Sequence, residues 1–366
     1  MTHADIMAIA KIKQQEAESE WYNLRPLLGN ANWAMLFIML GGREAGKSYA
    51  VTNFLVDQFV NRGIPFVWLR LTDAQSRKLL QNNAEKLVDP DLRRKYNLDL
   101  TTNGTNVYQV TRRSKPDVNG KTKILEKKLM ARVLNLSTFY TDKGSIFDKD
   151  FLNDPNMRYN IACDEFEREK NEKNTFDILY AFTNQLENLV RSTKSRVRVF
   201  LMGNTLEEAS DILAALNFIP EKFGTYRIKK KRAVIEYIEP SAKYLARRKG
   251  TLADILMPTA STFTNKIDVD NSLIDKSTKL LKPQYVIKFT KDKNNWYTVW
   301  NNNIVTKWNG EKKQVIAMRP YIDEVYSQDR VSAIIQLFDT RCYLFRNLIT
   351  FKKFQGQLQL LKPRKQ

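Results

Sequence analysis

The chain has little of the side-chain chemistry that histidine and cysteine provide. Its 366 residues include one histidine, His3, and two cysteines, Cys163 and Cys342. One histidine near the first residue argues against histidine triads, histidine acid–base catalysis and histidine metal sites. Two cysteines so far apart in sequence suggest neither a zinc knuckle nor a disulfide framework, which agrees with a reducing compartment. Chemistry in this chain therefore depends on carboxylates, amines, guanidinium groups or hydroxyls.

Long apolar runs are also scarce, and negative charges are outnumbered by positive ones. No apolar run approaches the length of a membrane span, and the first residues lack the layout of a signal peptide, so we expect a cytosolic protein with no membrane partner. Lys and Arg number 60 against 40 Asp and Glu, a formal net charge of +20. This excess favours a polyanionic partner such as nucleic acid, although a solvated basic surface would give the same composition. The length allows two or three domains.

The most informative feature present is a glycine-rich motif. Residues 41–48 read GGREAGKS and fit the Walker A pattern, between an apolar run, Ala34–Leu40, and a helix-forming stretch, Ser48–Phe59. The glycines let successive backbone N–H groups face one concavity, an anion site at a helix N-terminus. The lysine would reach the β- and γ-phosphates and the serine hydroxyl would hold Mg²⁺. The residues expected to bind ATP are Gly41, Gly42, Arg43, Glu44, Ala45, Gly46, Lys47 and Ser48.

Two adjacent acids end a later apolar segment. The run Arg158–Glu165 reads as a short strand that ends in Asp164 and Glu165. Asp164 would bind Mg²⁺, and Glu165 would polarise the attacking water as general base. Alone, such a pair is as well explained by solvated loop acids. Downstream of a Walker A motif it predicts an ATP-hydrolysing site.

Further candidates follow from neighbouring segments. The strand Arg198–Thr205 ends in Asn204 and Thr205, which would sense the γ-phosphate, unless they only form a turn. A helix running from 184 into a basic turn offers an arginine to a neighbouring subunit's site. Arg191 is the first choice there, with Arg196 second and Lys143 third, and a cation satisfying the helix dipole is the alternative.

The order of elements predicts an α/β fold. Strands alternate with helices from 34 to 204, which indicates a parallel sheet of the P-loop NTPase (RecA/ASCE-like) type. We expect a P-loop ATPase domain over 1–240, a polar linker over 241–283 and a small α/β domain over 284–366, which opens with the strands Tyr285–Lys291 and Trp296–Trp300.

Two basic clusters are candidate DNA contacts. One occupies the expected loop between the strands Val107–Thr111 and Leu129–Phe139, and the other a hairpin turn near 230. Basic loops of this kind contact phosphates, or are simply solvated. The candidate residues are Lys121, Lys123, Lys127, Lys128, Lys229, Lys230 and Lys231.

With these motifs assembled, the chain resembles the DNA-packaging ATPases of small podovirus-type bacteriophages, compact relatives of large terminase subunits. The motifs that carry the resemblance span about residues 30–205. It implies a homomeric ring, expected to be a pentamer, at the portal vertex of a prohead in the host cytoplasm, where ATP hydrolysis drives double-stranded viral DNA inward. Transferred by position, Lys47 and Ser48 bind phosphate and Mg²⁺, Asp164 binds metal, Glu165 is the base, Asn204 and Thr205 match the coupling motif, and Arg191 is the arginine finger, placed by region only. The basic C-terminal region would contact the portal or a structural packaging RNA.

The C-terminal domain of large terminases is an RNase H-like nuclease, and the resemblance implies that fold here. Such a nuclease needs acids around two metal ions, the first on the opening strand. The opening strand Tyr285–Lys291 has no acid before Asp292, and the later acids resemble ordinary helix-surface charges. We therefore expect a vestigial nuclease, with an active one as the alternative.

Other nucleotide-dependent functions stay open. Residues 265–268 read NKID, a guanine-recognition signature, but no apolar strand precedes them. A helicase or AAA-type ATPase would share the Walker motifs, and a small-molecule kinase would not need the positive charge. A DNA-binding protein that uses nucleotide only as a switch would not need Glu165.

Overall fold

The computed structural model describes residues 21–117, 121–141, 157–167, 176–190, 197–204, 210–256, 272–318 and 327–361. The chain divides into two compact units, Met1–Leu206 with Pro220–Ile267, and Glu207–Ile219 with Asp268–Gln366. The segment Glu207–Ile219 thus groups with the C-terminal residues, although it lies between two strands of the first unit in sequence. Its helix α8 (Asp211–Ala215) contacts α13 (Leu348–Gln359) through an ion pair of 3.5 Å between Lys352 and Asp211. Within the described ranges, no helix is long and apolar enough to cross a membrane.

The first unit contains a large mixed sheet. Nine strands of the described chain form it in the order β3-β4-β5-β2-β6-β7-β1-β9-β8. All neighbours from β5 to β1 are parallel, as the sequence predicts for residues 34–204, and β1·β9 is parallel as well. The pairs β3·β4, β4·β5 and β8·β9 are antiparallel. The strands are β1 (Leu36–Leu40), β2 (Phe66–Arg70), β3 (Leu100–Asn103), β4 (Asn106–Arg113), β5 (Ile124–Asn135), β6 (Tyr159–Asp164), β7 (Val197–Gly203), β8 (Gly224–Ile228) and β9 (Ala233–Tyr237).

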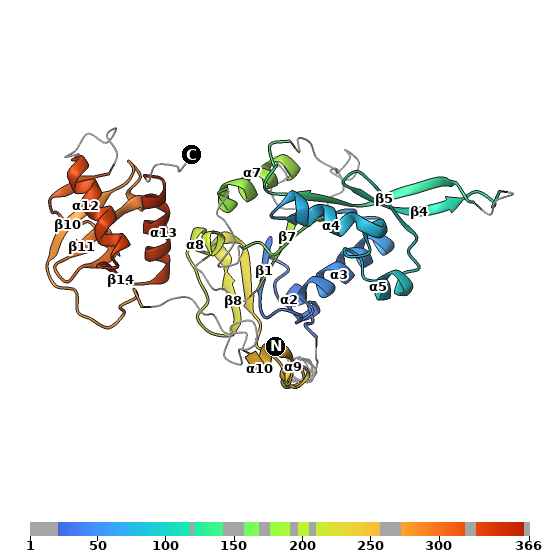
Figure 1. The fold of residues 1–366 in the computed structure, drawn as a ribbon, viewed down its shortest axis with the longest axis horizontal. Coiled ribbons are helices and arrows are strands. Elements are labelled where there is room, and N and C mark those ends of the chain that lie inside the picture. The colour runs from blue at the N-terminus through green and yellow to red at the C-terminus, as the bar shows by residue number, and fades with distance from the viewer. Residues whose placement is uncertain are drawn as a thin grey trace. The chain divides into compact units, whose positions relative to one another are not determined.

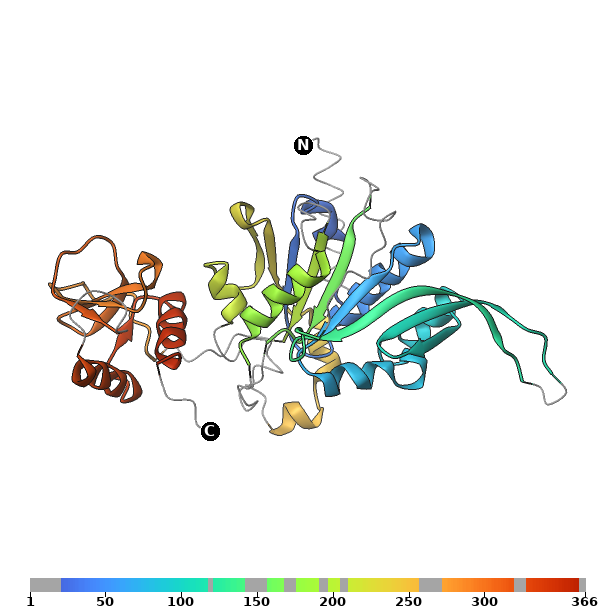
Figure 2. The same ribbon diagram turned by 90° about the horizontal axis from the view of Figure 1, so that it is seen from above.

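Helices cover both faces of this sheet. Helix α3 (Lys47–Arg62) connects β1 to β2, and helix α7 (Ile178–Val190) connects β6 to β7. These two crossovers run in opposite directions along the strand order. Because such connections are right-handed, the two helices lie on opposite faces of the sheet (Figure 2). On the α3 face, Phe37 and Phe200 pack with Leu55 in the main hydrophobic core. The remaining helices are α2 (Arg25–Asn30), α4 (Asp73–Ala84), α5 (Pro90–Lys95), α9 (Ala242–Arg248) and α10 (Leu252–Leu256).

The strands β4 and β5 continue beyond the sheet as a two-stranded ribbon (Figures 1 and 2). The sequence predicts a basic loop over 112–128, but β5 begins at Ile124, so Lys127 and Lys128 lie on a strand rather than in a loop. Two cross-strand pairs extend the β4·β5 ladder along the ribbon. Arg112 forms an ion pair with Glu126, and Arg113 pairs with Ile124. Strand β3 was not predicted, because Leu100–Asn103 is too short and polar for a clear alternation.

The second unit is built on a smaller sheet. Its five described strands have the order β13-β10-β11-β12-β14, with antiparallel β10·β11 and β11·β12 and parallel β10·β13 and β12·β14. Aromatic residues such as Phe289, Tyr297 and Phe354 form its core with α13 and α12 (Gln328–Asp339). The strands are β10 (Pro283–Lys288), β11 (Trp296–Trp300), β12 (Ile304–Lys307), β13 (Val315–Ala317) and β14 (Leu344–Phe345).

Candidate nucleotide site

The glycine-rich motif connects β1 to α3, as predicted. Gly46 has φ 88° and Glu44 has φ 60°, both in the left-handed region, and α3 begins at Lys47. Glycine adopts this conformation without steric cost, whereas Glu44 must be held there by its surroundings. The Gly41 N–H donates to the Gly203 carbonyl at 3.3 Å, which ties the start of the loop to the end of β7. The loop therefore has the curled backbone of a phosphate site at a helix N-terminus.

The Lys47 ammonium lies inside this loop. Its Nζ donates to the carbonyl oxygens of Gly41 and Gly42 at 2.8 and 2.7 Å, and the residue is 7% exposed. Burial lowers the pKa of Lys47 to about 8, although Asp164 and Glu165 act to raise it. A buried ammonium with only carbonyl partners is well placed to receive an anionic phosphate.

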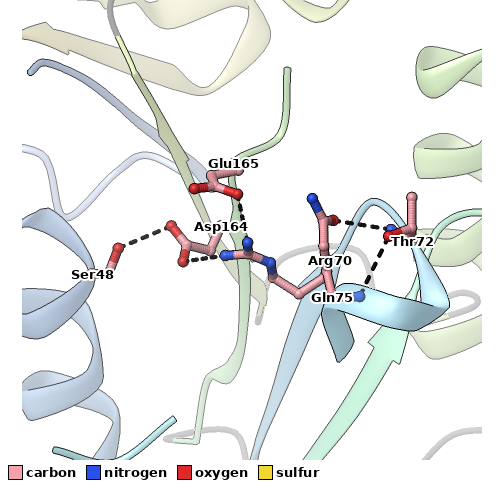
Figure 3. Close-up of polar contacts among 6 residues, drawn as sticks. All are labelled: Ser48, Arg70, Thr72, Gln75, Asp164 and Glu165. Atoms are coloured by element: carbon pink, nitrogen blue, oxygen red, sulfur yellow. Dashed lines mark hydrogen bonds and ion pairs between the residues drawn. The ribbon is translucent and has the colours of Figure 1, made fainter. Parts of the chain in front are cut away.

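The two predicted acids meet Ser48 and an arginine at the same edge of the sheet (Figure 3). Ser48 Oγ donates to Asp164 Oδ1 at 2.9 Å. Arg70 at the end of β2 donates through Nη1 to Asp164 Oδ2 at 2.6 Å and through Nη2 to Glu165 Oε2 at 2.5 Å. These groups come together because β1, β2 and β6 are parallel and their carboxyl ends share one edge.

The Arg70 contact lies between an uncommon backbone conformation at Glu165 and a capped helix start after β2. Glu165 has φ 54°, an uncommon backbone conformation that directs the acid after Asp164 to the same guanidinium. Beyond Arg70, the Thr72 side chain and Gln75 form a capping box that starts α4 immediately after β2 (Figure 3). Arg70 Nε is buried and has no hydrogen-bond partner in the described part of the chain. The hydrogen bonds of this guanidinium therefore go from Nη1 and Nη2 to the two carboxylates.

Arg70 stands at the end of the apolar run Ile64–Leu71, which the sequence pattern identifies as a strand, but this pattern assigns the arginine no role. Its contact with the acids depends on β2 lying next to β6, a pairing of strands that are far apart in the chain. The sequence does offer one signal for a site residue. Arg70 ends the first strand that follows the Walker A motif along the chain.

An Mg²⁺ ion fits the donors present. Ser48 and Asp164 supply a hydroxyl and a carboxylate oxygen 2.9 Å apart beside the phosphate loop, and such hard oxygen ligands suit Mg²⁺, which completes its shell with water and phosphate. Within the described ranges, no group of three or more His, Cys, Asp or Glu side chains is arranged for a metal.

Asn204 follows β7 at the same edge. The register pairs Gly203 with Leu40, so Asn204 lies level with the start of the phosphate loop. A Cβ on Gly203 would come within 2.8 Å of the Phe166 ring, so the residue before Asn204 must be glycine. The other predicted site residues, Thr205, Arg191, Arg196 and Lys143, lie outside the described residues, as does the segment 265–268.

The basic candidates lie away from this edge. β5 pairs with β2 only through 131–135, so Lys127 and Lys128 precede the sheet on the amino side of β5, and Lys121 and Lys123 lie farther along the ribbon. Lys229–Lys231 form the exposed turn η1 just before β9, again at the amino end of a parallel strand. Lys127 Nζ lies 4.2 Å from the centroid of the Tyr108 ring, and Lys128 Nζ lies 5.5 Å from that of the Phe59 ring. Both clusters therefore lie toward the amino ends of the parallel strands, whereas the phosphate loop lies at their carboxyl ends.

One protein family matches most of the chain, and individual phage proteins and solved structures are similar to it. Residues 17–338 match the family described as podovirus DNA encapsidation protein (Gp16). The DNA packaging proteins of Bacillus phage PZA and Bacillus phage phi29 are each 23% identical over 268 residues, which is 71% of this chain and 68% of theirs. The fold is similar to a chain of the bacteriophage Phi-29 viral genome packaging motor assembly, with TM-score 0.61 and 20% identity over 94% of this chain and 100% of that one. A chain of the Phi-28 gp11 DNA packaging motor gives TM-score 0.59 and 15% identity, over 95% and 99% of the two chains.

Proposed function

Because the chain belongs to the podovirus DNA encapsidation protein family, we propose that it is an ATPase that drives double-stranded viral DNA into a prohead. The observation that carries the ATPase part is the contact of Ser48 with Asp164 beside a curled phosphate loop, with Glu165 next to it. The family match and the two phage relatives support the DNA-packaging part. We place the first unit in the RecA/ASCE class of P-loop ATPases.

Each residue of the site has a distinct task in this proposal. The N–H groups of the loop and Lys47 bind the phosphates of ATP, and Glu165 accepts a proton from the attacking water. Ser48 and Asp164 would hold Mg²⁺, which when bound neutralises charge on the phosphates. Asn204, level with the loop, is positioned to respond to the γ-phosphate, and we extend this role to Thr205.

Arg70 restrains the base before hydrolysis. In the structure Arg70 Nη2 donates to Glu165 Oε2, so this carboxylate oxygen is engaged by the guanidinium rather than by the attacking water. In this proposal Glu165 exchanges the guanidinium for water when hydrolysis begins. A change at Arg70 or β2 that accompanies DNA engagement would therefore switch hydrolysis on, which links the ATP cycle to the DNA.

The ribbon and the turn η1 are the proposed DNA contacts. Their lysines are exposed, carry the positive charge that phosphates attract, and lie across the sheet from the ATP site. DNA and ATP would then lie at opposite ends of the parallel strands of one sheet, and these strands connect the two sites.

The proposed assembly is a homomeric ring at the portal vertex, with five subunits expected and an arginine, Arg191, supplied to the neighbouring ATP site. The similar Phi-29 structure is part of a motor assembly, which supports an oligomer. The basic C-terminal unit would contact the portal or a packaging RNA. We retain an RNase H-like fold as a proposal for this unit, and a lack of nuclease activity, since β10 carries Lys288 and no acid.

The direct test is steady-state ATP hydrolysis with and without double-stranded DNA. The wild-type protein should hydrolyse ATP faster with DNA, and Glu165→Gln should remove hydrolysis while retaining ATP binding. Arg77→Gln, a substitution of an exposed arginine on α4, serves as control. DNA-independent hydrolysis that survives in Glu165→Gln would contradict the assignment of the base.

A further inference from the structure

The outer side of the phosphate loop is held by α9, a helix that is distant from it in sequence. Tyr244 Oη and Arg248 Nη1 both donate to the Arg43 carbonyl, at 2.8 and 3.0 Å. Arg247 Nη2 donates to the Glu44 carbonyl at 2.9 Å. Two successive carbonyls of the loop thus accept hydrogen bonds from side chains of one short helix.

A second segment completes this support. The backbone N–H of Tyr22 donates to the Ala45 carbonyl at 2.9 Å, and a Cβ on Gly46 would lie 3.3 Å from the Trp21 ring. The Arg247 guanidinium lies 4.4 Å from the centroid of that ring, so α9 and the segment before α2 contact each other over the loop. The carbonyls of residues 43, 44 and 45 are all occupied from outside.

The topology explains why α9 lies here. β9 is parallel to β1, with Tyr237 paired to Leu40, and Ile238 N–H donates to the Leu40 carbonyl at 2.8 Å. The chain that leaves β9 therefore emerges beside the loop that leaves β1. Ser241 caps α9 by accepting from the Tyr244 N–H at 3.1 Å, which orients the helix toward the loop.

The chemistry of these contacts favours phosphate binding. In a loop whose N–H groups face a phosphate, the carbonyls face away, and donors that satisfy those carbonyls hold the peptide planes in that orientation. Bonds from guanidinium groups are charge-assisted, and they gain strength where solvent is excluded. Tyr244 is 2% exposed and Arg248 is 7% exposed, and Arg248 Nη1 also donates to Tyr244 Oη at 2.8 Å.

We propose that Tyr244, Arg247 and Arg248 are positioning residues that keep the phosphate loop in its ATP-binding conformation. They touch the loop and not the reacting atoms, so they set the affinity for nucleotide rather than the rate of the chemical step. The inference rests on the proposed ATPase function for the identity of the ligand.

The test compares dissociation constants for a fluorescent ATP analogue with KM and kcat for ATP, using the full-length protein. Tyr244→Phe and Arg247→Ala should each raise the dissociation constant and KM by about tenfold, the typical effect of removing a buried or charge-assisted hydrogen bond, with kcat within about twofold of wild type. Arg247→Lys should restore part of the affinity. Lys243→Ala removes the same charge from an exposed position of α9 and should leave both constants unchanged.

The outcomes separate the inference from the function on which it rests. Equal dissociation constants for wild type, Tyr244→Phe and Arg247→Ala would overturn the inference alone, as would a fall in kcat with unchanged KM. Arg248→Lys, which retains charge at a buried position, provides a further variant, with thermal unfolding as a check of folding. Failure of the wild-type protein to bind the analogue would contradict the proposed function and the inference together.

Discussion

The contact between Arg70 and Glu165 leads to a prediction about hydrolysis in the absence of DNA. If Arg70 restrains the base, Arg70→Gln should raise the DNA-free rate, because glutamine is neutral and cannot bridge both acids. Sequestration of a catalytic carboxylate thus predicts a gain of basal activity rather than a loss.

The exposure of the groups sets the size of this gain. The Glu165 side chain is 42% exposed, against 12% for Arg70 and 16% for Asp164, so the Arg70–Glu165 contact is substantially screened by water. A screened ion pair contributes about 0.5–1 kcal/mol. Since about 1.4 kcal/mol is a factor of ten, releasing Glu165 should raise the DNA-free rate by about two- to fivefold. The stimulation by DNA should fall by the same factor.

The assay is phosphate release at saturating ATP and Mg²⁺, with and without DNA. Arg77→Gln is the matched control, since Arg77 also pairs with an acid, Asp73 at 2.7 Å, but is 79% exposed on α4. It should leave both rates unchanged. A DNA-free rate in Arg70→Gln as low as that of Glu165→Gln would refute the restraint and make Arg70 a direct participant in hydrolysis.

Three further predictions concern the ammonium in the loop, the ribbon and the finger. Burial lowers the pKa of Lys47 to about 8, below its value of about 10.5 in the unfolded chain. The unfolded state therefore holds more protons between about pH 8 and 10.5. Across that window the free energy of unfolding of the nucleotide-free protein should rise with pH relative to that of Lys47→Met. ATP binding near pH 8 should accordingly take up a proton, seen as a dependence of the calorimetric heat on buffer ionisation, and no uptake by wild type would contradict this. The quadruple substitution to Ala at Lys121, Lys123, Lys127 and Lys128 should weaken DNA binding. It should also reduce the slope of log affinity against log salt by about 0.9 for each phosphate that the protein no longer neutralises. An unchanged slope would assign the DNA contact to Lys229–Lys231 instead. Arg191→Ala should lower DNA-stimulated turnover by about 10³-fold, and a variant that retains most of its turnover would exclude Arg191 as the finger.

The parts of the site that follow strand ends could be predicted from the sequence. An apolar run followed by GGREAGKS, and another followed by Asp164 and Glu165, place these residues together because carboxyl ends of parallel strands share an edge. The contacts of Arg70 could not be predicted in this way. Its position at a strand end can be predicted, but its partners depend on the order of strands in the sheet, which periodicity does not encode.

Other features depend on tertiary contacts with no local sequence signal. The α9 residues contact the loop because β9 pairs with β1, and the pattern of Ala242–Arg248 by itself indicates only a short basic helix. The ribbon is longer than predicted because cross-strand pairing keeps charged residues such as Arg112 and Glu126 in strand conformation. The grouping of Glu207–Ile219 with the C-terminal unit likewise follows from packing on α13.

If ATP hydrolysis at this site moves DNA into a prohead, the DNA should become inaccessible to nuclease. Protection of double-stranded DNA from nuclease is measured after incubation with purified protein, matching proheads and ATP. Protected DNA is expected with the wild-type protein, and none with Glu165→Gln or without ATP. Hydrolysis by the wild-type protein with no protected DNA, under conditions in which the proheads are competent, would contradict it.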